Sequence, residues 1–214
     1  MGCSCVGVED FLFKPSDEPK RLVVYLHNKF RLKHKAQFLQ LSYELCQLAR
    51  IKILQLIKNE VDIDKKEEED NKDFKIIDIT NYLKDDNTGY EQDFIDYEKY
   101  YYERDSNIHY EKDDFDNEIG ENLYISTEDR KNNDNIINAC KNWYNEKNKY
   151  NFDLNKYQKG TGHFTQMIWK ETQKIGFSYC KLKNGKSFFL VLYYPIGNEI
   201  FKFKKNVEKN QNNN

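Results

Sequence analysis

The first five residues, MGCSC, carry chemistry that would attach the chain to a membrane. Removal of the initiator methionine would expose Gly2 for N-myristoylation, and Cys3 and Cys5 would be available for S-palmitoylation, although Val6 stands where Ser or Thr is preferred. A single myristoyl chain binds bilayers only marginally, at roughly 10⁴ M⁻¹, whereas a second acyl chain or a basic surface makes attachment stable. Residues 1–18 are therefore predicted to be an N-terminal anchor segment. The alternative is an unmodified tail whose cysteines are incidental.

The other three cysteines, Cys46, Cys140 and Cys180, occur singly. No CxxC pair suggests a metal knuckle, and an odd total of five cysteines does not require a disulfide framework. Lone buried cysteines usually pack as small hydrophobic side chains, and thiols stay reduced in the cytosol. These three are expected to be reduced core residues.

Charge and hydropathy argue against nucleic-acid binding and against a membrane span. The 34 Lys and Arg and the 36 Asp and Glu give a formal net charge of −2, and no basic block is long enough to follow a nucleic-acid backbone. No run approaches the roughly 20 apolar residues that cross a bilayer, and the N-terminus lacks the apolar stretch of a secretory signal. The chain is therefore expected to stay inside the cell.

Helices and strands must position any site, and the pattern of apolar residues predicts both. Residues 22–31, 42–58 and 136–146 have the one-face apolar spacing of helices. Strand-like segments follow at 164–169, 174–180 and 187–194, the last of which is apolar throughout and must be covered on both faces.

Asn184 and Gly185 separate the last two strands and predict an antiparallel hairpin. Helices first, a sheet last and a doubly covered strand predict an α+β fold, a three-layer α-β-α sandwich with a central antiparallel sheet.

Residues 59–105 differ in composition from the rest of the chain. They carry 17 Asp and Glu against 7 Lys and Arg, a local charge of −10 that leaves +8 for the remainder. This segment is interpreted as a solvated, partly helical insertion. The expected organisation is one domain over 19–200 that contains the acidic insertion, followed by a polar tail over 201–214.

Several motifs occur in an order that indicates a family. Residues 162–172, GHFTQMIWKET, combine His, Gln and Trp in a way that chance rarely produces. They follow three earlier blocks: His27-Asn28 with Arg31 and His34, then GENL at 120–123, then WYNE and YNF within 143–152. The last block, YYPIGN at 193–198, matches the family pattern less closely than the others. Val191 stands where the secreted members of that family have a cysteine.

In these blocks the chain resembles the CAP superfamily, which comprises cysteine-rich secretory proteins, antigen 5 and pathogenesis-related 1 proteins. The resemblance covers residues 22–198 except the insertion. It is nearest to the disulfide-poor, intracellular branch of Golgi-associated relatives of plant pathogenesis-related proteins.

The resemblance implies a site in which two histidines and two glutamates converge in a cleft. The matching positions are His109, Glu121, Glu146 and His163. Imidazole and carboxylate groups are suitable ligands for zinc. Three hypotheses for these four residues stay open: a zinc site, a metal-free hydrogen-bond network, or catalysis with a glutamate as general base. The resemblance gives His27 and His34 a structural role, holding helix and loop together.

The resemblance also implies lipid binding, because CAP domains as a class are associated with sterols, fatty acids or phospholipids. The expected function is that of an acylated, non-enzymatic, intracellular protein on the cytosolic face of an endomembrane or the plasma membrane, with membrane lipids as its partners. The alternatives are a metal-assisted hydrolase or peptidase that uses the same four residues, and a protein-interaction scaffold. A homodimer is compatible with all three.

Overall fold

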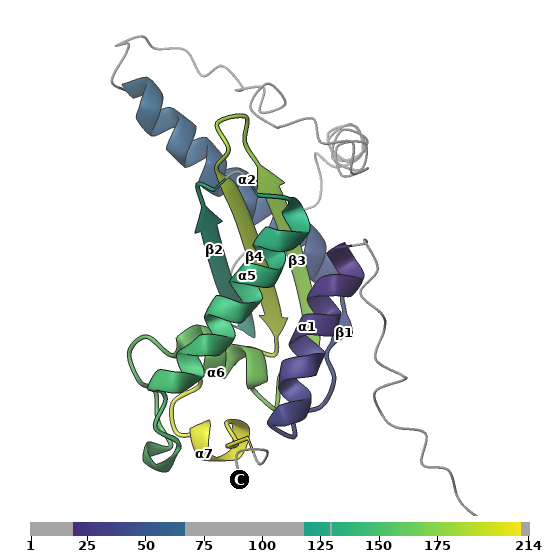
Figure 1. Cartoon of the computed structure of the whole chain (residues 1–214), viewed down its shortest axis with the longest axis vertical. Coiled ribbons are helices and arrows are strands. Elements are labelled where there is room, and N and C mark those ends of the chain that lie inside the picture. Colours follow the sequence, from purple (N-terminus) through teal and green to yellow (C-terminus); the bar gives the residue numbers. More distant parts are fainter. Residues whose placement is uncertain (1–18, 67–117, 129, 211–214) are drawn as a thin grey trace, which may run out of the picture.

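A four-stranded sheet lies between two layers of helices in the computed structural model of the chain (Figure 1). The structure describes residues 19–66, 118–128 and 130–210. Its strands are β1 (Gln40–Leu41), β2 (Gly120–Ser126), β3 (Lys174–Lys181) and β4 (Ser187–Tyr194). Its helices are α1 (Pro19–Lys33), α2 (Tyr43–Lys66), α5 (Asn132–Asn145), α6 (Gly162–Ile168) and α7 (Phe203–Asn206), with 3-10 turns η4 (Glu146–Lys149) and η5 (Phe152–Leu154). The predicted α+β sandwich is confirmed.

The strand order is β1-β3-β4-β2, and one pairing differs from the prediction. β4 pairs antiparallel with both β2 and β3, and Gly185, with φ of +88°, lies in the predicted hairpin turn. β1, however, runs parallel to β3, so the sheet is mixed rather than antiparallel. A strand of two residues is too short to show an alternating pattern, so β1 could not be predicted from the apolar pattern.

Helix α2 covers one face of the sheet through mostly aliphatic contacts. The buried side chains of this cluster are Leu45, Ala49, Ile53, Ile57, Ile119, Cys180, Leu182, Phe188, Leu190 and Leu192. The helix approaches β3 so closely that a Cβ atom at Gly176 would lie 2.3 Å from the backbone carbon of Leu45. Only glycine fits there, because a methyl group would meet backbone atoms rather than a movable side chain.

Helices α1, α5 and α6 cover the opposite face, which is rich in aromatic side chains. The strand predicted over 164–169 is wrong, because these residues form most of α6. Residues 164–168 are all buried, so the segment has no polar side that would reveal its period. In a short run whose two polar residues, Thr165 and Gln166, are buried beside apolar ones, the pattern does not distinguish a buried strand from a buried helix.

The C-terminal residues pack against the domain as far as the described chain extends. A polar tail was expected from residue 201, but Phe203 and Val207 are buried in the aromatic cluster. Phe203 packs edge-on against Trp169, with ring centroids 5.1 Å apart. Asn206 is fully buried and accepts a hydrogen bond from the Glu171 amide at 2.8 Å. Phe203, Asn206 and Val207 therefore belong to the core.

The segments with unusual composition fall mostly outside the described residues. Helix α2 continues to Lys66, eight residues into the predicted acidic insertion. The remainder of that insertion and the predicted anchor over 1–18 lie outside the described residues. Among the described helices, none has both the length and the apolar character that a bilayer span requires.

The single cysteines are core thiols, as expected. Cys140 and Cys180 are buried, Cys46 is partly buried, and all three are unbridged. Burial raises the pKa of the Cys140 thiol, so this side chain stays protonated at physiological pH.

Candidate functional site

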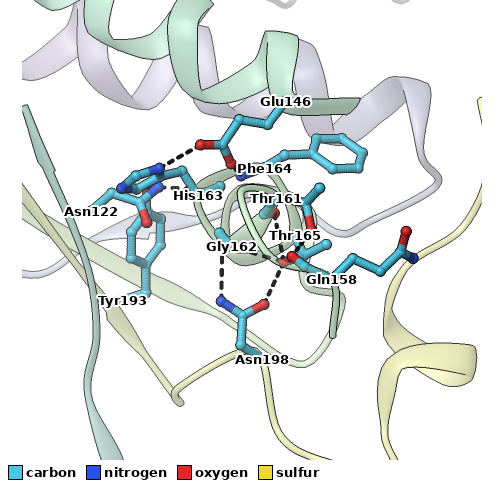
Figure 2. Close-up of polar contacts among 10 residues, drawn as sticks. All are labelled: Asn122, Glu146, Gln158, Thr161, Gly162, His163, Phe164, Thr165, Tyr193 and Asn198. Carbon is cyan, nitrogen blue, oxygen red and sulfur yellow. Dashed lines mark hydrogen bonds and ion pairs between the residues drawn. The ribbon is translucent and has the colours of Figure 1, made fainter. Parts of the chain in front are cut away.

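Glu146 and His163 make the central contact of the site (Figure 2). Glu146 begins η4 directly after α5, and His163 lies in the first turn of α6. His163 Nδ1 donates to Glu146 Oε1 at 2.7 Å, and the Phe164 amide donates to Glu146 Oε2 at 3.1 Å. Because amides in the first turn of a helix have no acceptor within it, one carboxylate both caps α6 and orients the imidazole.

The other side of the imidazole is accessible. The His163 side chain is 43% exposed, whereas that of Glu146 is 17% exposed. The imidazole stacks on Trp143, with ring centroids 6.0 Å apart and an interplanar angle of 23°. Nε2 has no hydrogen bond to the described part of the chain. The pair therefore presents one ring nitrogen that can form a hydrogen bond with a ligand.

A buried chain of hydrogen bonds connects this pair to α1. Asn122 Nδ2 donates to the His163 carbonyl at 3.1 Å and to the Tyr193 hydroxyl at 3.0 Å. The hydroxyl in turn donates to His27 Nε2 at 2.8 Å, while His27 Nδ1 donates to the Val23 carbonyl at 2.8 Å. Burial, opposed in part by the bond to Val23, lowers the pKa of His27 from 6.5 to about 4. His27 is therefore neutral at physiological pH.

A second set of contacts fixes the opposite side of α6. Asn198 Nδ2 donates to the Gly162 carbonyl at 2.9 Å, and Asn198 Oδ1 accepts from the Thr165 hydroxyl (Figure 2). The Gly197 amide donates to Gln166 Oε1 at 2.9 Å. The segment after β4 thus holds the helix that carries His163.

Arg31 joins α1 to the C-terminal end of α6 without a carboxylate partner among the described residues. Its guanidinium donates to four backbone carbonyls, those of Gln37, Met167, Trp169 and Thr172, at 2.7 to 3.0 Å. Burial lowers the pKa of Arg31 to about 10, so it remains charged at neutral pH. The last carbonyls of a helix lack intrahelical donors, and this buried cation supplies them.

His34 likewise connects segments rather than facing the site. Its Nδ1 donates to the Glu208 carbonyl at 2.6 Å, and its Nε2 accepts from the Tyr144 hydroxyl at 3.0 Å. Burial lowers the pKa of His34. His27 and His34 therefore hold elements together, which is the role that the resemblance implies for them.

Glu121 does not join Glu146 and His163. In the β2–β4 register Glu121 lies opposite Leu192, which belongs to the face under α2. Directly opposed residues share a face, and the Glu121 carboxylate lies 3.5 Å from Lys52 Nζ on α2. The neighbouring residue Asn122 points to the other face and contacts the His163 backbone.

A zinc site would need more ligands than the described residues bring together. Within residues 19–66, 118–128 and 130–210, no group of three or more His, Cys, Asp or Glu side chains is placed to hold a metal. The predicted ligand His109 lies outside the described residues. Of the four predicted residues, the structure brings together Glu146 and His163, and these two alone do not fit a closed zinc site.

Three residues of the site had no predicted role: Arg31, Asn122 and Tyr193. A sequence signal existed for the first. Arg31 follows His27 by four positions, so both lie on the same face of α1 as buried Val23, and His34 follows three positions later, just after the helix ends. Polar residues on the buried face of a helix require hydrogen-bond partners, and this pattern indicates a buried network.

Comparisons with known proteins agree with this architecture. The family model described as "CAP: Cysteine-rich secretory protein family" matches residues 24–194. The human Golgi-associated plant pathogenesis-related protein 1 is 36% identical over 92 residues, which is 42% of this chain and 57% of the human one. Mouse GLIPR1-like protein 1 is 40% identical over 86 residues, which is 38% of this chain and 35% of the mouse one. The chain thus spans less than two thirds of either relative.

The solved structure of BmVAL-1 is similar in fold, with a TM-score of 0.51 and 18% sequence identity. The superposition covers 87% of this chain and 81% of that one.

Proposed function

Because this chain belongs to the CAP family of cysteine-rich secretory proteins, we propose that it is a non-enzymatic, lipid-engaging member whose basic domain binds anionic phospholipid on intracellular membranes. Sterol and fatty acid were the other lipid classes expected from the resemblance. The charge of the domain favours anionic phospholipid, since a neutral sterol gains nothing from a cationic surface.

The observation that carries the proposal is the net charge of the described residues, which leave out most of the acidic insertion. The described residues contain 27 Lys and Arg against 13 Asp and Glu, a formal net charge of +14, although the whole chain carries −2. Anionic membrane surfaces attract such a domain by about 1 kcal/mol for each Lys or Arg that comes close to the surface.

One basic cluster on the surface of the domain lies where the end of α1 meets η4, and it consists of Lys33 and Lys147 beside the Tyr144 ring. Lys33 Nζ lies 5.9 Å, and Lys147 Nζ 4.5 Å, from the centroid of the Tyr144 ring. Burial and the nearby Lys33 cation lower the pKa of Lys147. Neither lysine has a carboxylate partner within the described residues, so an anionic headgroup would relieve the repulsion between them.

Acylation would provide the second part of membrane attachment. Gly2, Cys3 and Cys5 would supply myristoyl and palmitoyl groups, and an acyl chain combined with a basic surface gives stable retention. The name of the human relative describes that protein as Golgi-associated, which supports an intracellular membrane location for this chain.

The experiment is flotation of the full-length, unacylated chain with vesicles. Neutral phosphatidylcholine vesicles are compared with vesicles that also contain phosphatidylserine, from about 0.05 M to about 0.5 M salt. We expect binding that requires the anionic lipid and falls at least about tenfold over this salt range. The double variant Lys33→Glu, Lys147→Glu should bind more weakly than the matched hairpin variant Lys183→Glu, Lys186→Glu. Equal binding to neutral and anionic vesicles at all salt concentrations would refute the proposal.

A further inference from the structure

The turn at residues 199–202 exposes two adjacent apolar side chains. The Lys202 amide donates to the Glu199 carbonyl at 3.2 Å and closes the turn, and Ile200 and Phe201 occupy its tip. Their exposed fractions are 73% and 97%, the two largest among the exposed large hydrophobic side chains of the described residues. Neither side chain contributes to the core.

The backbone at this tip is unfavourable for the residue it carries. Phe201 has φ of +70°, a left-handed conformation that glycine and asparagine adopt more readily than an aromatic residue. A bulky residue held in such a conformation, with its side chain in solvent, destabilises the folded protein without a compensating internal contact. Such local strain is a reason to look for a function outside the fold.

Both flanks of the turn are fixed, so the tip is held in place. On one side, Asn198 bonds to Gly162 and Thr165 in α6. On the other side, Phe203 is 1% exposed and packs against Trp169. The turn that carries the two apolar side chains is therefore held on both sides, and it directly precedes α7, which lies at one end of the molecule (Figure 1).

Exposed lysines follow the tip in the chain. Lys202, Lys204 and Lys205 follow it directly and are all exposed. Tyr157, whose ring centroid is 6.5 Å from that of Phe203, is 55% exposed and lies between Lys156 and Lys159 in the sequence. The acidic side chains beside the turn, Glu171 and Glu199, are paired with Lys202 and Lys205.

We propose that the Ile200–Phe201 turn inserts into the interface of an anionic bilayer and so orients the domain on the membrane. This inference rests on the proposed function, for which it names the contact point. An apolar tip followed by exposed lysines matches a bilayer, because the tip reaches the acyl boundary while the ammonium groups remain among anionic headgroups. Tyr157 would lie at headgroup depth, where the amphipathic ring of tyrosine is favoured.

The direct test uses Phe201→Trp in the full-length chain with vesicles of phosphatidylcholine and phosphatidylserine. Both native tryptophans are buried, Trp143 at 3% and Trp169 at 0% exposure, so an added exposed indole is distinguishable by difference spectra. On vesicle binding, its emission should shift to shorter wavelength and be quenched by lipids brominated in the acyl chain. Emission that stays at the water-exposed wavelength in vesicle-bound protein would overturn the inference.

A second test separates binding from folding. Phe201→Gly should weaken vesicle binding about tenfold, because a buried aromatic side chain is lost, while thermal stability stays the same or rises. Ile125→Ser removes another exposed apolar side chain, 43% exposed, near the β3–β4 hairpin and should leave binding unchanged.

The outcomes distinguish the two proposals. If the wild-type chain binds no vesicles, the proposed function and this inference both fail. If it binds anionic vesicles and Phe201→Gly binds equally well, the inference fails while the proposed function stands. If sedimentation shows a dimer that Phe201→Gly dissociates, the tip contacts a second copy of the chain, and the bilayer contact is overturned.

Discussion

The face of the sheet under α2 and the face under α1, α5 and α6 bury different kinds of side chain. Under α2 the buried side chains are mostly aliphatic, and the helix lies almost in contact with the β3 backbone at Gly176. Under the other three helices, aromatic rings surround the fully or nearly fully buried His27, Arg31 and His34.

The two faces of the sheet therefore contribute to the fold in different ways, one through apolar burial and the other also through hydrogen bonds. The aliphatic face excludes water and stabilises the sheet by burial alone, which depends on shape rather than on particular partners. The face under α1, α5 and α6, called the polar face below, also depends on hydrogen bonds between particular side chains. It carries the Glu146–His163 pair. Side chains on adjacent positions of β2 are divided between the two faces, since Glu121 faces α2 and Asn122 faces α6.

Arg31→Met should have the largest effect, since it removes the donor for four buried carbonyls. Unsatisfied buried acceptors destabilise by about 1–3 kcal/mol each, partly offset by the loss of a buried charge, so we expect about 4 kcal/mol less free energy of unfolding. Urea denaturation measures this. Arg130→Met, at a side chain that is 48% exposed, is the control and should leave the free energy of unfolding nearly unchanged. If Arg31→Met lowered the free energy of unfolding by less than about 1 kcal/mol, the four hydrogen bonds of Arg31 would not be important for stability.

Gly176→Ala tests the aliphatic face. The added methyl group would lie 2.3 Å from Leu45 and 2.4 Å from the Cys46 amide nitrogen, so α2 must move away from β3. We expect a loss of about 3 kcal/mol. In Gly162→Ala the nearest atom is 3.6 Å away, in Tyr157, and stability should be nearly unchanged. Equal stability of the two variants by urea denaturation would show that α2 does not pack closely against β3 at Gly176.

The polar face should also lose stability in acid through His27. Its pKa is about 4 in the folded protein and near 6.5 when unfolded, so the unfolded state binds the proton more readily. Stability should therefore fall as pH decreases from about 6.5, by about 3 kcal/mol at pH 4. His27→Gln, which no longer titrates, should have a correspondingly shallower profile in denaturation measured from pH 7 to pH 4. Parallel profiles would exclude His27 as the cause.

The smallest effects should come from the two glutamates, since Glu146→Gln tests the contact with His163 and Glu121→Gln tests the contact with Lys52 on the other face of the sheet. Glu146→Gln weakens a charge-assisted bond to His163 and should lower stability by about 1 kcal/mol, whereas Glu121→Gln should have almost no effect. Calorimetry gives both values.

Zinc provides a separate test of the Glu146–His163 pair. Neither zinc nor a chelator should change the melting temperature of the wild-type protein or of His163→Ala. Stabilisation by zinc that His163→Ala abolishes would instead establish a metal site.

The predictions from sequence succeeded where periodicity was long or a turn was specific. The helices over 22–31, 42–58 and 136–146 correspond to α1, α2 and α5, because several turns of apolar spacing define a face. Asn184 and Gly185 correctly placed the β3–β4 hairpin. α6 and α7 were missed because each is short. In α6, burial of five consecutive residues also removes the alternation on which such predictions depend.

The site was predicted only in part, and the reason is strand register. The resemblance named Glu121 and Glu146 together, but the side on which a strand residue points changes with a shift of one position. In the structure this places Glu121 beside Lys52, while Asn122 contacts the site. The hydrogen bond between Asn122 and Tyr193 depends on the pairing of β2 with β4, which sequence pattern alone did not determine.

The hydrogen bonds of α1 have a consequence for protein synthesis. Arg31 bonds to residues 136, 138 and 141 positions downstream, and His27 bonds to Tyr193, 166 positions away. At a translation rate of about 5–20 residues per second, on the order of 10 to 30 seconds separate the synthesis of α1 from that of β4. During that interval α1 leaves the ribosome with its ionisable groups still hydrated and its apolar face open to chaperones. The domain therefore completes folding only after β4 has emerged.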